Sequence, residues 1–239
     1  MLSPIHFQQP SLTRTQKNKA LLYAEQILRA EQQMIQPKKG HHLLHHTLEH
    51  AQNHLQKKHY PEGDRIDKTT GAQYFYHCHR EDYAQEEHGH FHCFMRYAHI
   101  PKKIKPHPLP DWDKYIDNPM THLIAIAMNR YGKPIRLFTV NRWVTSEIWY
   151  DSEHTQQLLS QFKFTLNNNA HWEILDQWVE GILHLFTPQI ICLCKARDNF
   201  IKNKLITETN IKNIYTHQTL SELSTLPINL EQQIQWLLG

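Results

Sequence analysis

The chain has 239 residues, and 40% of them are hydrophobic, so it is long enough and apolar enough to bury a core and is not expected to be disordered. Its 26 Lys and Arg residues nearly balance its 23 Asp and Glu residues, which leaves a formal charge of +3 with the 20 histidines neutral. This balance argues against nucleic acid and against an anionic membrane as partners.

The cysteines and the start of the chain favour a soluble, cytoplasmic protein with reduced thiols. The four cysteines form neither a CxxC motif nor the framework of a small secreted domain; they are Cys78, Cys93, Cys192 and Cys194. Met1 is not followed by a basic and then an apolar segment, and no apolar run reaches about 18 residues. We therefore expect no membrane-spanning helix.

The N-terminal part is predicted to be helical. From Leu12 to about Gln36 good helix formers place apolar residues on one face, and Pro37 stops the pattern. A second helix is predicted from about Leu43 to His59, ended by Pro61 and Gly63.

The middle of the chain is predicted to be β-rich. Alternating segments rich in aromatic and β-branched residues predict strands over 74–79, 88–96, 121–129 and 135–145. Residues 101–119 hold five prolines and are expected to form a surface loop. Because short connections join the strands, we expect an antiparallel sheet.

The C-terminal part returns to helical patterns over about 153–163, 169–186, 188–204 and 229–238. The order of elements predicts an α+β fold, with a central antiparallel sheet of at least four strands flanked by N-terminal and C-terminal helices. We expect a single domain over 1–239, composed of a helical part (12–60), a histidine-rich β core (72–150) and a second helical part (153–239).

The segment HCHREDYAQEEHGHFHCF (77–94) is the densest group of metal-ligating residues. Side chains alternate between the two faces of a strand, so the histidines of each predicted strand share one face and Cys78 and Cys93 point the other way. One natural hairpin register sets His79 opposite His88 and His77 opposite His90.

This register predicts a metal site. Four imidazoles would converge on one patch, and His122 at the start of the next strand could reach it; they suit Zn²⁺, or Fe(II) with a carboxylate added. His88 and His92 lie about 13 Å apart by strand rise, so His92 is assigned a different role. Glu87 and His92 are the candidate catalytic acid–base groups. The alternatives are a metal-free acid–base or hydrogen-bonding cleft, and a solvated polar face.

Two further groups are weaker candidates. On the predicted helix 43–59 a stripe of histidines recurs every four residues, where it could chelate a metal weakly or simply be solvated; it comprises His42, His46, His50 and His54. Arg136 and Arg142 share a face of the last predicted strand and could bind a small acidic substrate. Equally, they could form ion pairs with Glu86, Glu87 or Glu147.

A set of segments resembles a family of uncharacterised bacterial proteins, a domain of unknown function with a GHFH-type motif, here Gly89–His92. These segments are YHCH, EEHGHFHCF, THLIAIAM, RLFTVNRWVT and LSTLPINLEQQI, and the resemblance runs over roughly 74–150 and 185–238, leaving 41–59 outside. It implies a cytoplasmic bacterial domain and centres interest on His77, His79, His90, His92 and His122. It implies no established activity.

Three hypotheses about function follow. The first is a metal-dependent enzyme, a hydrolase or an oxygenase, that holds Fe or Zn through His77, His79, His88, His90 and His122. The second is a non-catalytic protein that stores, carries or senses a metal. The third is a metal-free interaction module in which the histidines are incidental.

Overall fold

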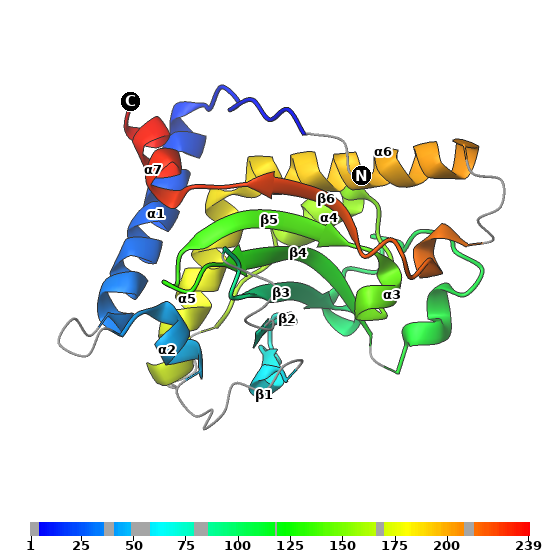
Figure 1. Ribbon diagram of the computed structural model, residues 1–239, viewed down its shortest axis with the longest axis horizontal. Helices are drawn as coiled ribbons and strands as arrows, with labels where there is room; N and C mark the ends of the chain where they lie inside the picture. Colours follow the sequence, from blue (N-terminus) through cyan, green and yellow to red (C-terminus); the bar gives the residue numbers. More distant parts are fainter. Residues whose placement is uncertain are drawn as a thin grey trace.

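The computed structural model describes residues 5–35, 41–48, 58–78, 86–117, 119–165, 170–207 and 213–239. Within these ranges a six-stranded antiparallel sheet runs in the order β1-β2-β3-β4-β5-β6 (Figure 1). The strands are β1 (Tyr60–Ile66), β2 (Ala72–Cys78), β3 (Gly89–Arg96), β4 (Met120–Met128), β5 (Pro134–Val140) and β6 (Glu222–Pro227). The helices are α1 (Arg14–Met34), α2 (Leu43–Leu48), α3 (Arg142–Thr145), α4 (Ser152–Leu159), α5 (Ala170–Leu185), α6 (Thr187–Thr207) and α7 (Leu230–Leu238).

Helix α1 shows how the local sequence sets an element. Thr13 caps its first turn by accepting from the backbone N–H of Gln16, whose side chain accepts from the backbone N–H of Thr13 in return. The buried side chains Ala24, Ile27, Ala30 and Met34 recur at helical spacing and form its core-facing side, which packs on α5.

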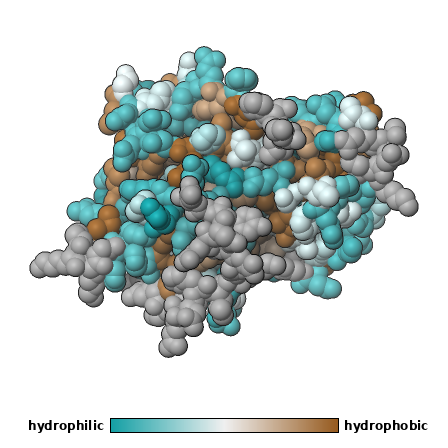
Figure 2. Space-filling view, in the orientation of Figure 1, coloured by the Kyte–Doolittle hydropathy of each residue, from teal (hydrophilic) through white to brown (hydrophobic). Residues whose placement is uncertain are grey.

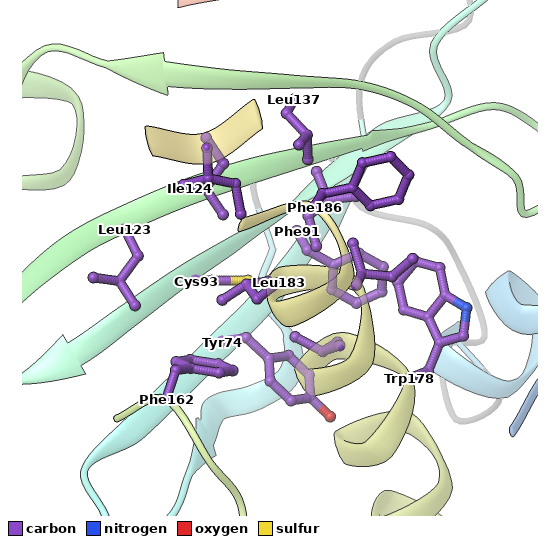
Figure 3. Close-up of a cluster of buried hydrophobic side chains, with 14 of the residues drawn as sticks. Tyr74, Phe91, Cys93, Leu123, Ile124, Leu137, Phe162, Trp178, Leu183 and Phe186 are labelled. Carbon is purple, nitrogen blue, oxygen red and sulfur yellow. The ribbon is translucent and has the colours of Figure 1, made fainter. Parts of the chain in front are cut away.

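The main hydrophobic core lies between the sheet and the helices that cover one of its faces. Apolar side chains of β2, β3, β4 and β5 meet those of α5 and the start of α6, as Figure 3 shows for Tyr74, Phe91, Ile124, Leu137 and Trp178. Cys78 and Cys93 belong to this core, and all four cysteines are free. The helix-facing side of the hairpin therefore carries the thiols and leaves the histidines on the other side.

The predicted fold class is confirmed: the fold is α+β, with an antiparallel sheet and helices before and after it. Strands β1 and β6, at the two edges of the sheet, were not predicted. In β1 Pro61 and Gly63 suggested the end of a helix, yet both are compatible with an edge strand that contains an irregularity between Tyr60 and Arg65. Gly63 there adopts a φ of 79°, which a glycine reaches without strain.

One predicted strand needs correction, and one predicted helix is only partly described. The strand predicted over 135–145 ends at Val140, because the Asn141 side chain accepts from the backbone N–H of Arg142 and starts the short helix α3. The helix predicted over 43–59 is described only as Leu43–Leu48, and residues 49–57 lie outside the described ranges.

The surface of the described residues combines hydrophilic and hydrophobic side chains. Figure 2 shows hydrophilic side chains over much of this view, interspersed with smaller hydrophobic areas. Taken singly, none of the described helices has both the length and the apolar character to cross a membrane, although α5 and α6 together, bent by 67°, meet those two criteria.

Candidate metal centre

The β2–β3 hairpin has the predicted register and brings two of the predicted ligands together. His77 of β2 lies opposite His90 of β3, and Phe75 lies opposite His92. Strand β4 pairs with β3 on the other side, and a register irregularity between Cys93 and Phe94 sets His122 opposite Phe94. His122 therefore reaches the same patch, as its position at the start of the third predicted strand suggested.

Three imidazoles form a group that could hold a metal ion. One ring nitrogen from each of His77, His90 and His92 lies within 4.8 Å of the other two. The ring centroids of His77 and His90 are 4.3 Å apart, and those of His90 and His92 are 4.6 Å apart. His90 and His92 are 7% and 2% exposed, whereas His77 is half-buried. We call these three residues the His triad.

A chain of hydrogen bonds links the His triad to residues on both sides. Glu87 Oε1 lies 2.9 Å from His90 Nδ1, His90 Nε2 lies 3.0 Å from His92 Nε2, and His92 Nδ1 lies 3.0 Å from His122 Nε2. An ionised carboxylate can only accept, so the Nδ1–H of His90 donates to Glu87. In a neutral ring His90 Nε2 then carries a lone pair, which accepts from the Nε2–H of His92.

Glu87 is held in its ionised form. Burial opposes ionisation, but the hydrogen bond from His90 and the charge of Arg136 outweigh it, so the pKa of the Glu87 carboxyl lies below its ordinary value. Arg136 donates from Nε and Nη2 to Glu87 Oε2 at 3.0 and 2.7 Å. The carboxylate thus fixes both the orientation and the tautomer of His90.

Two histidines of this hydrogen-bond chain, His92 and His122, are held neutral. Burial lowers the pKa of His92 well below its ordinary value, and the neighbouring histidines His90 and His122 lower it further. Burial also lowers the pKa of His122 to about 3, assisted by the charges of Arg197 and His90. Neutral imidazoles are the form that ligates metals, so protons do not compete for these nitrogens near pH 7.

Aromatic and small apolar side chains surround the His triad. Phe138 lies edge-on to His90 at 4.9 Å between ring centroids, and Phe75 lies 5.2 Å from His92. Phe94 lies 5.2 Å from His122, and Ala125 and Ala127 on β4 are fully buried on this side with Phe138. An apolar shell of this kind lowers the local dielectric around an ion and controls the access of water to it.

Gly89, the first residue of the GHFH motif, has a steric role in this hairpin. A Cβ atom at this position would meet the backbone carbonyl oxygen of His77, and it would lie 2.6 Å from the hydroxyl of Tyr76. Position 89 therefore has room for glycine alone while His77 and His90 stay paired.

The other predicted ligands are placed differently. His88 precedes the first residue of β3 and so does not follow the strand alternation; its Nδ1 lies 2.8 Å from the hydroxyl of Tyr76, a side chain of the helix-facing core. The prediction that His88 shares a face with His77 and His90 is therefore wrong. His79 lies outside the described residues. His92, predicted to have a separate role, is a member of the His triad.

The two arginines do not share a face of β5, and the alternative prediction of an ion pair with Glu87 is confirmed for Arg136. Arg136 donates to Glu87, to both carboxylate oxygens of Glu222 at 2.9 Å and to Thr225 at 3.2 Å, so protein acceptors occupy its guanidinium group. Arg142 lies in α3 instead of β5, is completely buried, and donates to the Asp111 carboxylate at 2.7 Å and to the Glu147 backbone carbonyl at 3.0 Å. Both arginines thus have structural ion pairs or hydrogen bonds.

Two histidines near α2, His42 and His45, have the opposite tautomer from His90. The Nδ1 of His42 accepts from the backbone N–H of Leu44 at 3.3 Å, and the Nδ1 of His45 accepts from the backbone N–H of His42 at 3.2 Å. In a neutral ring the proton then lies on Nε2, which disfavours metal ligation through that nitrogen. His50 and His54 of the predicted stripe lie outside the described residues.

Sequence patterns did not identify Phe75 and Phe138 as walls of the site, nor Glu222 as a partner of Arg136. Glu222 is distant in sequence, and its position beside β5 follows only from the pairing of β5 with β6. For Phe75 and Phe138 a signal existed, because each lies at a spacing of two from His77 or Arg136 and so shares its face.

Comparison with known proteins identifies the family of the chain but assigns it no activity. No curated protein and no solved structure matches the chain. Residues 21–228 match the family model described as "Domain of unknown function (DUF6969)", a range that includes 41–59, which the resemblance noted in the sequence had left outside. The match covers the whole sheet and every residue of the His triad. The chain belongs to this family of domains of unknown function, DUF6969.

Proposed function

We propose that the protein binds one divalent metal ion through His77, His90 and His92. The observation that carries this proposal is the position of three imidazole nitrogens within 4.8 Å of one another, one of which belongs to a histidine anchored by a carboxylate. Histidines that bind metals almost always donate their other ring N–H to a carboxylate or carbonyl, and the Glu87–His90 hydrogen bond has this arrangement.

The spacing of the nitrogens suits an ion of the size of Zn²⁺. Two nitrogens bound at about 2.1 Å lie about 3.0 Å apart at a right angle and about 3.4 Å apart at a tetrahedral angle. His90 Nε2 and His92 Nε2 are 3.0 Å apart, so a small opening of the pair would admit an ion in either geometry. Ligation through His92 Nε2 would require the His92 proton on Nδ1, where it would donate to His122 Nε2, and hence the His122 proton on Nδ1.

The donor set favours Zn²⁺ over Fe(II). Non-haem Fe(II) oxygenases use two histidines and one carboxylate. Here both oxygens of the carboxylate nearest to the His triad, Glu87, are engaged, one by His90 and the other by Arg136. Three imidazoles with an open position are one of the ligand sets of catalytic zinc sites, in which the zinc activates a bound water, so a zinc-dependent hydrolase is the activity that we propose.

Metal content tests the binding proposal. Protein purified without a His-tag and without chelator should contain about one Zn²⁺ per chain by elemental analysis, and His77→Ala and His90→Ala should each lose it. His45→Ala is the matched control, because it removes a histidine from the group near α2 and should leave the zinc content unchanged. Equal zinc content in His77→Ala, His90→Ala and the unmodified protein would contradict the proposal.

A second candidate, a structural metal that joins β2 to β3, is favoured by the burial of the site. His90 and His92 are 7% and 2% exposed, so protein would enclose most of the ion, as it does a structural ion. The two candidates differ in their response to a chelator. A structural ion contributes folding free energy, so its removal should lower the melting temperature strongly, whereas removal of a catalytic ion should change it little.

A further inference from the structure

A cavity on the side of the molecule formed by helices has no part in the metal site. It has a volume of about 400 Å³ and lies between the start of α1, the end of α4, the α5–α6 corner and α7 (Figure 1). Its lining includes the apolar side chains Leu12, Ala20, Leu185, Pro188, Ile191 and Trp236. This volume falls in the range of sites for small organic molecules.

One edge of this cavity is positively charged. Lys19 is the one Lys, Arg, Asp or Glu side chain among the described residues that line it. Its Nζ lies 5.9 Å from the centroid of the Tyr23 ring, and within the described ranges no carboxylate forms an ion pair with it. An apolar cavity that carries a cation and no carboxylate complements a ligand with an apolar body and a single negative charge.

The polar groups beside Lys19 are neutral and fixed. The rings of Tyr23 and His184 stack 4.5 Å apart at 18°, and His184 Nε2 donates to the backbone carbonyl of Phe162 at 2.8 Å. Burial, together with the charge of Glu180, raises the pKa of Tyr23, so the phenol keeps its proton as a donor. Burial lowers the pKa of His184, so the imidazole adds no second charge.

We propose that this cavity binds a small monocarboxylate with an alkyl or aryl body, the carboxylate meeting Lys19 and Tyr23 and the body lying against Ile191 and Trp236. Binding here goes beyond the proposed metal function and does not depend on it, because no member of the His triad lines the cavity.

A neighbouring cavity supplies an internal control. It has a volume of about 510 Å³, lies between residues 5–9 and the start of α7, and is lined by amide and apolar side chains such as Gln189, Gln232 and Ile228. Lys, Arg, Asp and Glu are absent from its described lining, which includes His6 and the start of α7, so substitution in this cavity separates any anion binding here from binding at Lys19.

Calorimetric titration of the full chain with octanoate and octylamine tests the proposal. Octanoate should bind at least about fivefold more tightly than octylamine, and Lys19→Met should weaken octanoate binding about fivefold, as expected for loss of an exposed charged partner. Lys17→Met on the same helix should leave it unchanged, because Lys17 does not line the cavity.

Occlusion of the cavity locates the site. Ser160→Trp, at an exposed position on the rim, should reduce octanoate binding at least tenfold, whereas Gln232→Trp in the neighbouring cavity should not. The proposal is overturned if octanoate and octylamine bind equally, if Lys19→Met binds octanoate as the unmodified protein does, or if no octanoate binds at 10 mM. A circular dichroism spectrum and melting temperature matching those of the unmodified protein show that each variant is folded.

Discussion

Replacement of Glu87 by glutamine tests whether a carboxylate outside the His triad prepares His90 for a metal. Glu87 accepts from His90 Nδ1 at 2.9 Å and from two nitrogens of Arg136 at 2.7 and 3.0 Å, and its side chain is 16% exposed. The amide introduced by Glu87→Gln would keep one acceptor oxygen but lose the charge, and its NH2 group would face either His90 or Arg136 unfavourably.

The expected effect is a loss of zinc affinity of about tenfold, within the range of about 10- to 100-fold measured when such outer partners of metal-binding histidines are changed. Tenfold corresponds to about 1.4 kcal/mol, which is comparable to one hydrogen bond to a charged group. The dissociation constant is measured by competition with a chromophoric zinc chelator at pH 7.5.

Glu86→Gln is the matched control, because Glu86 precedes Glu87 in the chain, is exposed, and undergoes the same chemical change. Its zinc affinity should equal that of the unmodified protein. If Glu87→Gln also binds zinc with unchanged affinity, the tautomer of His90 is not set by Glu87, and the reasoning from the hydrogen-bond chain is wrong.

Three further predictions concern the hairpin, a buried ion pair and a buried carboxylate. Gly89→Ala should lower the zinc content at least tenfold and lower the melting temperature, because the added Cβ meets the His77 carbonyl oxygen. Elemental analysis and thermal unfolding measure these two effects. A normal zinc content would contradict the prediction. Arg65→Met should reduce the free energy of unfolding, measured by urea denaturation, by about 3 kcal/mol. The reason is that the Asp176 carboxylate, which is 3% exposed, loses its ion-pair partner at 2.6 Å. The double variant Arg65→Met/Asp176→Leu should recover most of that loss. Asp67→Asn should reduce the free energy of unfolding by about 2 kcal/mol at pH 7 and by less at pH 3. Burial opposes ionisation of Asp67, but hydrogen bonds from Thr165, Thr70 and Thr69 outweigh it and lower the pKa of this carboxyl. The stabilisation by Asp67 is therefore present above the unfolded pKa of about 4 and is lost as the pH falls through the pKa of the folded protein. A pH-independent difference between Asp67→Asn and the unmodified protein would contradict this assignment.

The alternation of side chains between the two faces of a strand was sufficient to place the residues of the hairpin wherever the hydrogen-bonded pairing of the strands is regular. It set His77 opposite His90 and turned Cys78 and Cys93 toward the helices, because each of these residues lies inside a regularly paired strand. His122 reaches the patch only through the register irregularity between Cys93 and Phe94. The same pattern was wrong for His88, which lies one residue before β3 begins, where the alternation no longer constrains a side chain.

Contacts between distant segments could not be predicted. The position of Glu222 depends on a six-residue edge strand, which pairs with β5 although the four helices α3 to α6 separate the two strands in the chain. The separate role assigned to His92 assumed that His88 occupied the site; once His88 turns away, His90 and His92 at a spacing of two remain close enough to meet. For Arg142 the error was one of element length, because the Asn141 cap ends the strand before it.

The order of the strands has a consequence for how this protein folds. Strands β1 to β5 each pair with the next strand in the chain, and the whole His triad lies on the single hairpin β2–β3. Such sequence-local contacts form early, whereas the pairing of Val140 with Glu222 must wait for the intervening helices. The proposed zinc ion would therefore bind before the sheet is complete, and we expect added zinc to accelerate refolding, whereas the ion pair between Arg136 and Glu222 forms late.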